Sequence, residues 1–192
     1  MVNTPATPSP SNPSRRSLLA SAVLGTGLLS AQHTQAQVQR PQTASSTEIP
    51  LVLPQTEFVY EAIAELSPAL PLGEGPLGER RMVPITGGNF EGPGLHGKVL
   101  AGGADRQLLR KDGTRLLDAL YELQTDDGAI ITVHNQVMSS TDANGKPYRF
   151  SHITLTAPEG KYGWLNRSVY VGTLHSLPPA RRAVIIRVYK LV

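Results

Sequence analysis

Apolar and polar residues alternate along several segments of the chain, beginning at Glu57. From Glu57 to Leu66 every second residue is apolar, and glutamates occupy three of the positions between them. A repeat of two residues predicts a strand with one buried face. The apolar face of this strand holds Phe58, Tyr60, Ala62, Ala64 and Leu66.

Several later segments have the same character, and two Asp-Gly pairs join some of them. Asp112-Gly113 and Asp127-Gly128 each separate two apolar runs, which is a strong hairpin signal. The prolines and glycines between 68 and 78 predict irregular structure there. The predicted strands are Arg80–Ile85, Asp105–Arg110, Arg115–Thr125, Ala129–Val137, Tyr148–Ala157, Tyr162–Leu174 and Ala183–Leu191.

The segment from Pro84 to Asp105 is rich in glycine. A helix is disfavoured there because each interior Gly would cost about 1 kcal/mol relative to Ala. In strands, Gly marks bulges, sharp bends and close backbone approaches. We therefore expect a bent β segment that ends on the carboxylate of Asp105.

These strands predict an all-β fold, because no window carries a long helical stripe. Short polar turns between strands are typical of a sandwich or a barrel. We favour a single closed or nearly closed antiparallel β-barrel of about 8 to 10 strands, lipocalin-like in shape. A barrel of about eight strands can hold one small ligand, and Tyr, Trp, Asn and His on the polar strand faces would suit such an interior.

The first part of the chain resembles an export signal followed by a linker. Arg15 and Arg16 precede a weakly apolar run, as in twin-arginine signals. Small residues predict cleavage after Ala36, with Ala31 as the alternative site. We therefore expect a signal peptide at 1–36, a disordered linker at 37–56, a barrel domain at 57–192, and a periplasmic or secreted protein. The alternative is an uncleaved membrane anchor.

Composition narrows the classes of partner. The 192 residues include no cysteine, which excludes disulfides and Cys nucleophiles. Without Arg15 and Arg16, 16 of the 18 basic side chains remain against 15 acidic ones. Such a near-neutral domain gives no electrostatic reason to expect nucleic acid binding. We expect a small organic ligand and no stable membrane association after cleavage, and the sequence leaves the oligomeric state open, a homodimer included.

Three carboxylates lie beside glycines at predicted strand ends, where a barrel mouth would gather them. They are Asp105, Asp127 and Glu91. A partly buried carboxylate can act as a general base once burial raises its pKa. The alternative for Asp127, or for its neighbour Asp126, is a local role in capping the turn.

Further candidates come from the strand interiors. His134, together with Tyr121 on the neighbouring strand, would hold or protonate a ligand oxygen, although a structural histidine is the alternative. Its neighbour Asn135 must face the opposite side of the strand. Trp164 and Asn166 would share a face that suits ligand stacking, although Trp164 could equally plug the barrel end.

Metal and cofactor sites have little support. The histidines lie in separate segments with no His-x-His or His-x-x-x-His pair. No Gly-x-Ser-x-Gly turn is present, and the glycine-rich segment lacks the strand-to-helix unit of a phosphate loop. We expect no metal and no cofactor.

The chain resembles a known bacterial and fungal family, domain of unknown function 3237, from Phe58 to Val192. The resemblance implies a single β-barrel domain and no settled activity. The chain departs from the family pattern at Arg106, where members usually carry Trp. The blocks that carry the resemblance are Arg80-Arg81, Pro84-Ile85-Thr86-Gly87-Gly88, Phe90-Glu91-Gly92-Pro93, Gly102-Gly103-Ala104-Asp105, Thr125-Asp126-Asp127-Gly128-Ala129 and Trp164-Leu165-Asn166-Arg167.

Two functions remain open from the sequence. The first is an exported barrel that binds a small, partly apolar organic molecule without necessarily changing it. The second is an enzyme on the same barrel, an isomerase, cyclase or lactone-type hydrolase. It would use Asp105 or Asp127 as a base and His134, Tyr121 or Arg106 to stabilise an oxyanion.

Overall fold

Strands make up nearly all of the regular structure. The computed structural model describes residues 50–192, so the predicted signal peptide and most of the predicted linker lie outside the described residues. Among residues 50–192 no helix has the length and hydropathy that a membrane span requires. The elements are β1 Thr56–Leu66, β2 Leu70–Gly75, β3 Gly78–Gly92, β4 Leu95–Val99, β5 Ala104–Arg110, β6 Arg115–Thr125, β7 Ile130–Thr141, β8 Pro147–Thr156, the 3₁₀ helix η2 Gly163–Arg167, β9 Tyr170–Ser176 and β10 Ala183–Leu191.

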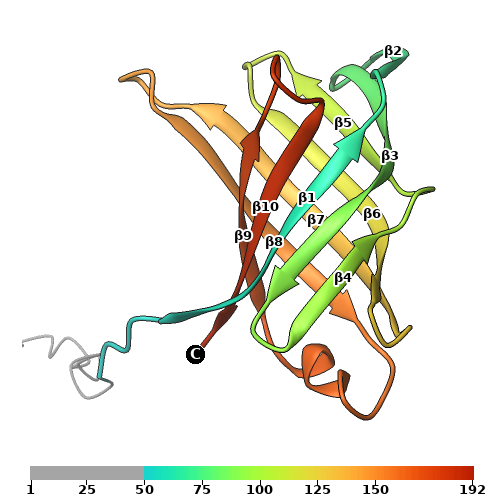
Figure 1. Cartoon of the computed structure of the whole chain (residues 1–192). Coiled ribbons are helices and arrows are strands. Elements are labelled where there is room, and N and C mark those ends of the chain that lie inside the picture. The colour runs from blue at the N-terminus through green and yellow to red at the C-terminus, as the bar shows by residue number, and fades with distance from the viewer. Residues whose placement is uncertain (1–49) are drawn as a thin grey trace, which may run out of the picture. The chain divides into compact units, whose positions relative to one another are not determined.

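The sheet closes into a barrel because β1 pairs on both sides, with β10 and with β3 (Figure 1). All pairings are antiparallel, and the order around the wall is β1, β10, β9, β8, β7, β6, then β4 or β5, then β3. The predicted antiparallel all-β barrel is confirmed. The segment that was expected to be irregular, 68 to 78, instead contributes β2, because β2 forms a hairpin with the start of β3.

β4 and β5 share one position in the wall. Both pair with β3 and with β6, β4 near one end of the barrel and β5 near the other. The interruption between them contains Gly103, where a Cβ atom would lie 2.5 Å from Cβ of Tyr121 on β6. A side chain has no room at this close approach, which explains a glycine at the break. The predicted bend in the glycine-rich segment is therefore this interrupted strand.

The two ends of the barrel differ. At one end η2 packs Leu165 inward, next to Tyr162, and the core there is filled. We call this the plugged end. At the other end the β5–β6 turn and the β7–β8 and β9–β10 loops surround the opening that we call the mouth (Figure 1).

The segment around Trp164 differs from its prediction. A strand from Tyr162 would have placed Trp164 and Asn166 on one face, but these residues belong to η2 at the plugged end. The 3₁₀ turn lies in the connection between the neighbouring strands β8 and β9, where it buries Leu165, and β9 begins only at Tyr170.

Candidate functional site

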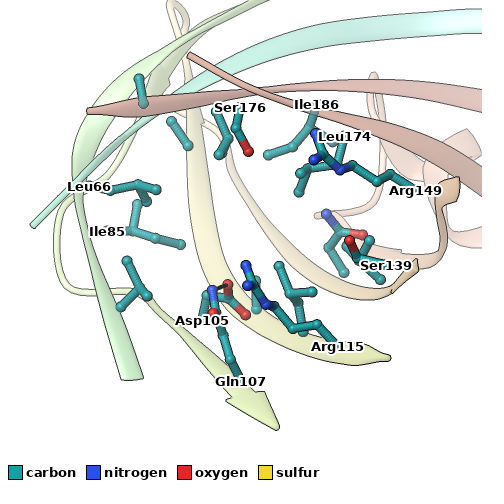
Figure 2. Close-up of a pocket in the computed structure, with 18 of the residues that line it drawn as sticks. Leu66, Ile85, Asp105, Gln107, Arg115, Ser139, Arg149, Leu174, Ser176 and Ile186 are labelled. Atoms are coloured by element: carbon teal, nitrogen blue, oxygen red, sulfur yellow. Dashed lines mark hydrogen bonds between the residues drawn. The ribbon is translucent and has the colours of Figure 1, made fainter. Parts of the chain in front are cut away.

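The barrel interior contains a cavity of about 170 Å³ on the side of the mouth. Apolar side chains from six strands, β1, β3, β6, β7, β9 and β10, form most of its wall (Figure 2). Ligand sites commonly combine such a wall with a few converging polar groups. The polar residues that line this cavity are Asp105, Gln107, Arg115, Tyr121, Asn135, Ser139, Arg149 and Ser176.

Asp105 projects into this cavity from the beginning of β5. Alternation along the strand turns Asp105 and Gln107 inward and Arg106 outward. Gln107 Nε2 donates a hydrogen bond of 2.6 Å to Asp105 Oδ2, and the backbone N–H of Asp118 donates one of 3.0 Å to Oδ1. The carboxyl group is thus fixed in orientation and only 9% exposed.

Burial raises the pKa of Asp105 above its ordinary value. The hydrogen bonds from Gln107 and Asp118 and the charge of Arg115 act in the opposite direction, but burial is the largest effect. No Lys or Arg nitrogen between residues 50 and 192 lies within 4.0 Å of this carboxylate. Asp105 therefore retains its proton at a higher pH than an ordinary aspartate and can act as an acid as well as a base.

Arg115 on β6 and Arg149 on β8 extend into the same cavity from different parts of the wall (Figure 2). Their guanidinium groups are donors only, so they recognise acceptor or anionic groups. Burial lowers the pKa of Arg115, and the charges of Arg81 and Arg149 lower it further. The two guanidinium groups thus offer hydrogen-bond donors to an incoming molecule.

Two polar side chains lie deeper in the cavity wall. Tyr121 is fully buried and Asn135 is 1% exposed. Asn135 Oδ1 has no hydrogen-bond partner among residues 50–192, and the only group there that interacts with the Tyr121 hydroxyl is the buried hydroxyl of Tyr60. Burial also raises the pKa of Tyr121, so this group remains a neutral hydroxyl. A bound molecule with its own hydroxyl could satisfy both groups.

Of the predicted catalytic residues, the structure brings Asp105 and Tyr121 to the cavity but not His134 or Asp127. His134 faces outward, and its Nε2 lies 2.6 Å from Asp118 Oδ1 at the exposed surface. Asp127 lies at the plugged end, where it accepts hydrogen bonds from Thr125, Lys161 and Tyr162.

The predicted ligand-binding residues all lie outside the cavity. Arg106 faces an outer groove beneath β2. Glu91 is exposed near the end of β3, opposite His96 of β4. On η2, Trp164 is 40% exposed, and Asn166 bonds both the N–H and the C=O of Ala157. These four residues are therefore not gathered at the mouth.

Five polar cavity residues were absent from the sequence-based candidates: Gln107, Arg115, Ser139, Arg149 and Ser176. Gln107 could have been predicted from the sequence, because it lies two residues after Asp105 and therefore on the same face of the strand. Arg115 and Arg149 carried no such signal, since a basic residue near a turn is usually solvated. Among residues 50–192 no group of three or more His, Asp or Glu side chains is placed to hold a metal ion.

A protein-family model matches the part of the chain that forms the barrel. The model described as "Protein of unknown function (DUF3237)" matches residues 54–191. An uncharacterised relative named "UPF0311 protein" from Rhodopseudomonas palustris is 41% identical over 81 residues, which cover 42% of this chain and 53% of the relative. The alignment thus spans about half the length of that relative.

A fungal relative has a more specific name. It is called "Hydroalkoxylation enzyme phnH", comes from Penicillium herquei, and is 32% identical over 120 residues, which cover 62% of this chain and 74% of the relative. A crystal structure of an enzyme from the same fungus superimposes with a TM-score of 0.59 and 25% identity over 75% of this chain and 98% of that one.

Two bacterial crystal structures are also similar. A conserved protein of unknown function from Rhodopseudomonas palustris has a TM-score of 0.69 and 27% identity, over 74% of this chain and 100% of that one. A beta-barrel like protein from Acinetobacter baumannii has a TM-score of 0.67 and 32% identity, over 74% of this chain and 99% of that one.

Proposed function

We propose the following function from the geometry of the cavity, given that this chain belongs to the DUF3237 family. The barrel binds a small, partly apolar organic molecule in the cavity and transfers a proton to it from Asp105. The observation that carries this proposal is a buried carboxyl group with a raised pKa in the wall of a mostly apolar cavity. Perturbed acids in cavities are common at catalytic sites.

The name of the fungal relative supports one kind of reaction, the addition of an O–H group across a carbon–carbon double bond. In this chain Asp105 would give its proton to one alkene carbon, which forms a C–H bond. The substrate hydroxyl oxygen would then bond to the adjacent carbon. Its proton would return to the Asp105 carboxylate, so the acid is regenerated and no oxidant or reductant is needed.

The cavity favours this proton transfer in two ways. Its apolar wall excludes water, which would otherwise compete for the positive charge that develops on carbon. The hydrogen bonds from Gln107 and from the Asp118 N–H hold the carboxyl group in place while it loses and regains its proton. The hydroxyl of Tyr121 is a further partner for the substrate oxygen.

The test uses ortho-methallylphenol, which carries a hydroxyl and an alkene in a molecule small enough for the cavity. Turnover would convert it to the isomeric dimethyldihydrobenzofuran. In D₂O the product should gain one deuterium on carbon, which mass spectrometry and NMR detect. Asp105→Asn should abolish this incorporation, because an amide cannot donate the proton. Asp126→Asn makes the same change at an exposed site, and should leave incorporation unchanged.

Binding without turnover is the second candidate. It is favoured because Asp105 is the only carboxylate among the lining residues between Ala64 and Ile186. If ligands bind, Asp105→Asn weakens the binding, and no alkenol, enol ester or lactone is turned over, then the barrel is a carrier and the catalytic proposal is wrong.

We also propose that the protein acts outside the cytoplasm. This proposal rests on Arg15 and Arg16 ahead of a weakly apolar run. Replacing both with Lys should stop export through the twin-arginine route. Unchanged amounts outside the cytoplasmic membrane would rule out that route.

A further inference from the structure

Three arginines lie on the inner face of the wall near the mouth. Arg115 and Arg149 line the cavity (Figure 2). Arg81 on β3 is two residues before Val83, which lines the cavity, so alternation turns Arg81 toward the same side, at the rim where it also borders the groove beneath β2. Arg81 is also the register partner of Gln107 on β5. The three side chains come from β3, β6 and β8.

The charges at the mouth are not balanced around Arg115. Arg81 and Arg149 disfavour its positive charge, and their effects exceed the favourable effects of Asp105 and Glu79. Asp105 contributes less negative charge still when it is protonated. An anion between the arginines would therefore relieve repulsion that the protein itself leaves in place.

Hydrogen-bond donors are also unused at this point. The Nε atoms of Arg81 and Arg115 are buried and have no acceptor among residues 50–192. None of the three arginines reaches a carboxylate within 4.0 Å in that part of the chain, whereas Arg110, Arg181 and Arg187 each do. Leaving a buried donor without a partner is unfavourable, so these groups indicate a place for a ligand acceptor.

We propose that the cavity binds a small organic acid, with its carboxylate held by Arg115 and Arg149 at the mouth and its apolar body against the inner wall. This inference rests on the proposed function and names the class of its substrate. The planar guanidinium group matches a carboxylate with two parallel hydrogen bonds. The cavity volume of about 170 Å³ suits a small aromatic acid such as benzoate.

An anionic substrate would also assist Asp105. A negative charge near a carboxyl group raises the pKa of that group, because ionisation would then place two negative charges together. Binding of the acid therefore keeps Asp105 protonated when its proton is needed. The carboxylate at the mouth also fixes which part of the substrate lies beside Asp105.

The test compares benzoate with benzyl alcohol, which has nearly the same shape and no charge. Titration of residues 50–192 or of the full chain, followed by NMR or calorimetry, should show that benzoate binds at least about tenfold more tightly. Arg115→Gln and Arg149→Gln should each weaken benzoate binding about tenfold or more and leave benzyl alcohol binding nearly unchanged. Arg149→Lys keeps the charge but loses the paired geometry, so its benzoate affinity should be intermediate.

Arg106→Gln is the matched control. It removes the same charge from β5, beside Asp105, but on the outer face. Benzoate affinity should not change in this variant, so a long-range effect of net charge is separated from direct contact. Thermal unfolding of each variant confirms that the barrel remains folded.

Several outcomes would overturn the inference. Equal affinity for benzoate and benzyl alcohol, or equal losses in Arg106→Gln and Arg149→Gln, would show that the arginines do not select an anion. Tighter binding of phenyl phosphate than of benzoate would replace the carboxylate by a phosphate. The proposed function is tested separately, because deuterium incorporation into the neutral alkenol needs no anion. Incorporation without benzoate binding would refute only this inference.

Discussion

His134 and Asn135 are consecutive in β7 but lie on opposite sides of the barrel wall. His134 pairs with Asp118 at the outer surface, and Asn135 is 1% exposed in the cavity wall. Asn135 Oδ1 has no donor among residues 50–192. The polar group that is well satisfied thus faces solvent, and the one without a partner faces the cavity.

This relationship predicts opposite effects of Asn135→Leu on stability and binding. Leu has a similar volume and removes an unsatisfied acceptor, so the free energy of unfolding should stay the same or rise by about 1 kcal/mol. Affinity for a hydroxylated ligand such as salicyl alcohol should fall about tenfold. Urea unfolding and ligand titration measure the two effects, and His134→Asn, which changes the outer face, should alter neither affinity nor cavity. A large loss of stability would mean that Asn135 is structural.

Asp105→Asn should change how stability depends on pH. The native state of the wild type has a raised Asp105 pKa, so the stability gained from its bound proton is complete below the ordinary aspartate pKa. That contribution is lost as the pH rises through the raised pKa. Asn stays neutral throughout, and the variant should therefore gain stability relative to wild type between about pH 4 and about pH 8. Urea unfolding at both pH values measures this, and a variant that loses stability at the higher pH would show that the carboxylate is needed for the fold.

Gly103→Ala should destabilise the barrel. The new Cβ would lie 2.5 Å from Cβ of Tyr121 and 2.8 Å from the carbonyl oxygen of Leu120, so β6 must move. Such overpacking costs about 1 to 3 kcal/mol, and displacement of Tyr121 should also weaken ligand binding. The control is Gly75→Ala, where the nearest atoms of other residues are 3.5 Å or more away. Equal unfolding free energies for both variants would mean that the β4–β5 break tolerates a side chain.

Asp127 holds the plugged end together, and Tyr162→Phe tests this. Tyr162 is 7% exposed and its hydroxyl donates to Asp127 Oδ1 at 2.9 Å. Losing this bond should lower the free energy of unfolding, because the charged Asp127 carboxylate loses a hydrogen-bond donor. Tyr148→Phe removes a hydroxyl from an exposed ring and should have almost no effect on unfolding. Matching losses in the two variants would contradict the role of Asp127.

Asp127 should also affect how the free energy of unfolding depends on acidic pH. Hydrogen bonds from Lys161, Thr125 and Tyr162 hold the pKa of Asp127 well below its usual range. Its contribution is present above the ordinary aspartate pKa and is lost as the pH falls through the lowered one. Asp127→Asn should therefore remove part of the acid sensitivity of unfolding. It should not change the deuterium incorporation into the product that depends on Asp105.

The fold could be predicted from the sequence because alternation and Asp-Gly turns act locally. The strand from Glu57 and the two hairpins follow from such signals. The 3₁₀ turn at Trp164 could not be predicted in this way, because the run to Leu174 also reads as a strand and the burial of Leu165 at the plugged end is a tertiary contact.

The site was predictable only in part, for a related reason. Asp105 stands out because it follows two glycines, and alternation fixed that either His134 or Asn135 must face inward. The choice between them depends on the register of β7 against β6 and β8, which turn geometry and the burial of one strand face determine together. The clustering of Arg115 with Arg149 depends on the same registers, which align both residues with Ser139 although they are 34 positions apart along the chain.

The chain enters and leaves the barrel at one place. Gln55 and Val192 exchange backbone hydrogen bonds of 3.0 and 2.9 Å, beside the start of β9 and therefore at the plugged end. Anything joined covalently to either terminus of the barrel, such as a fusion partner, an affinity tag or a solid support, starts from the end opposite the mouth. The barrel can therefore be immobilised through either terminus with its opening directed toward the surrounding solution.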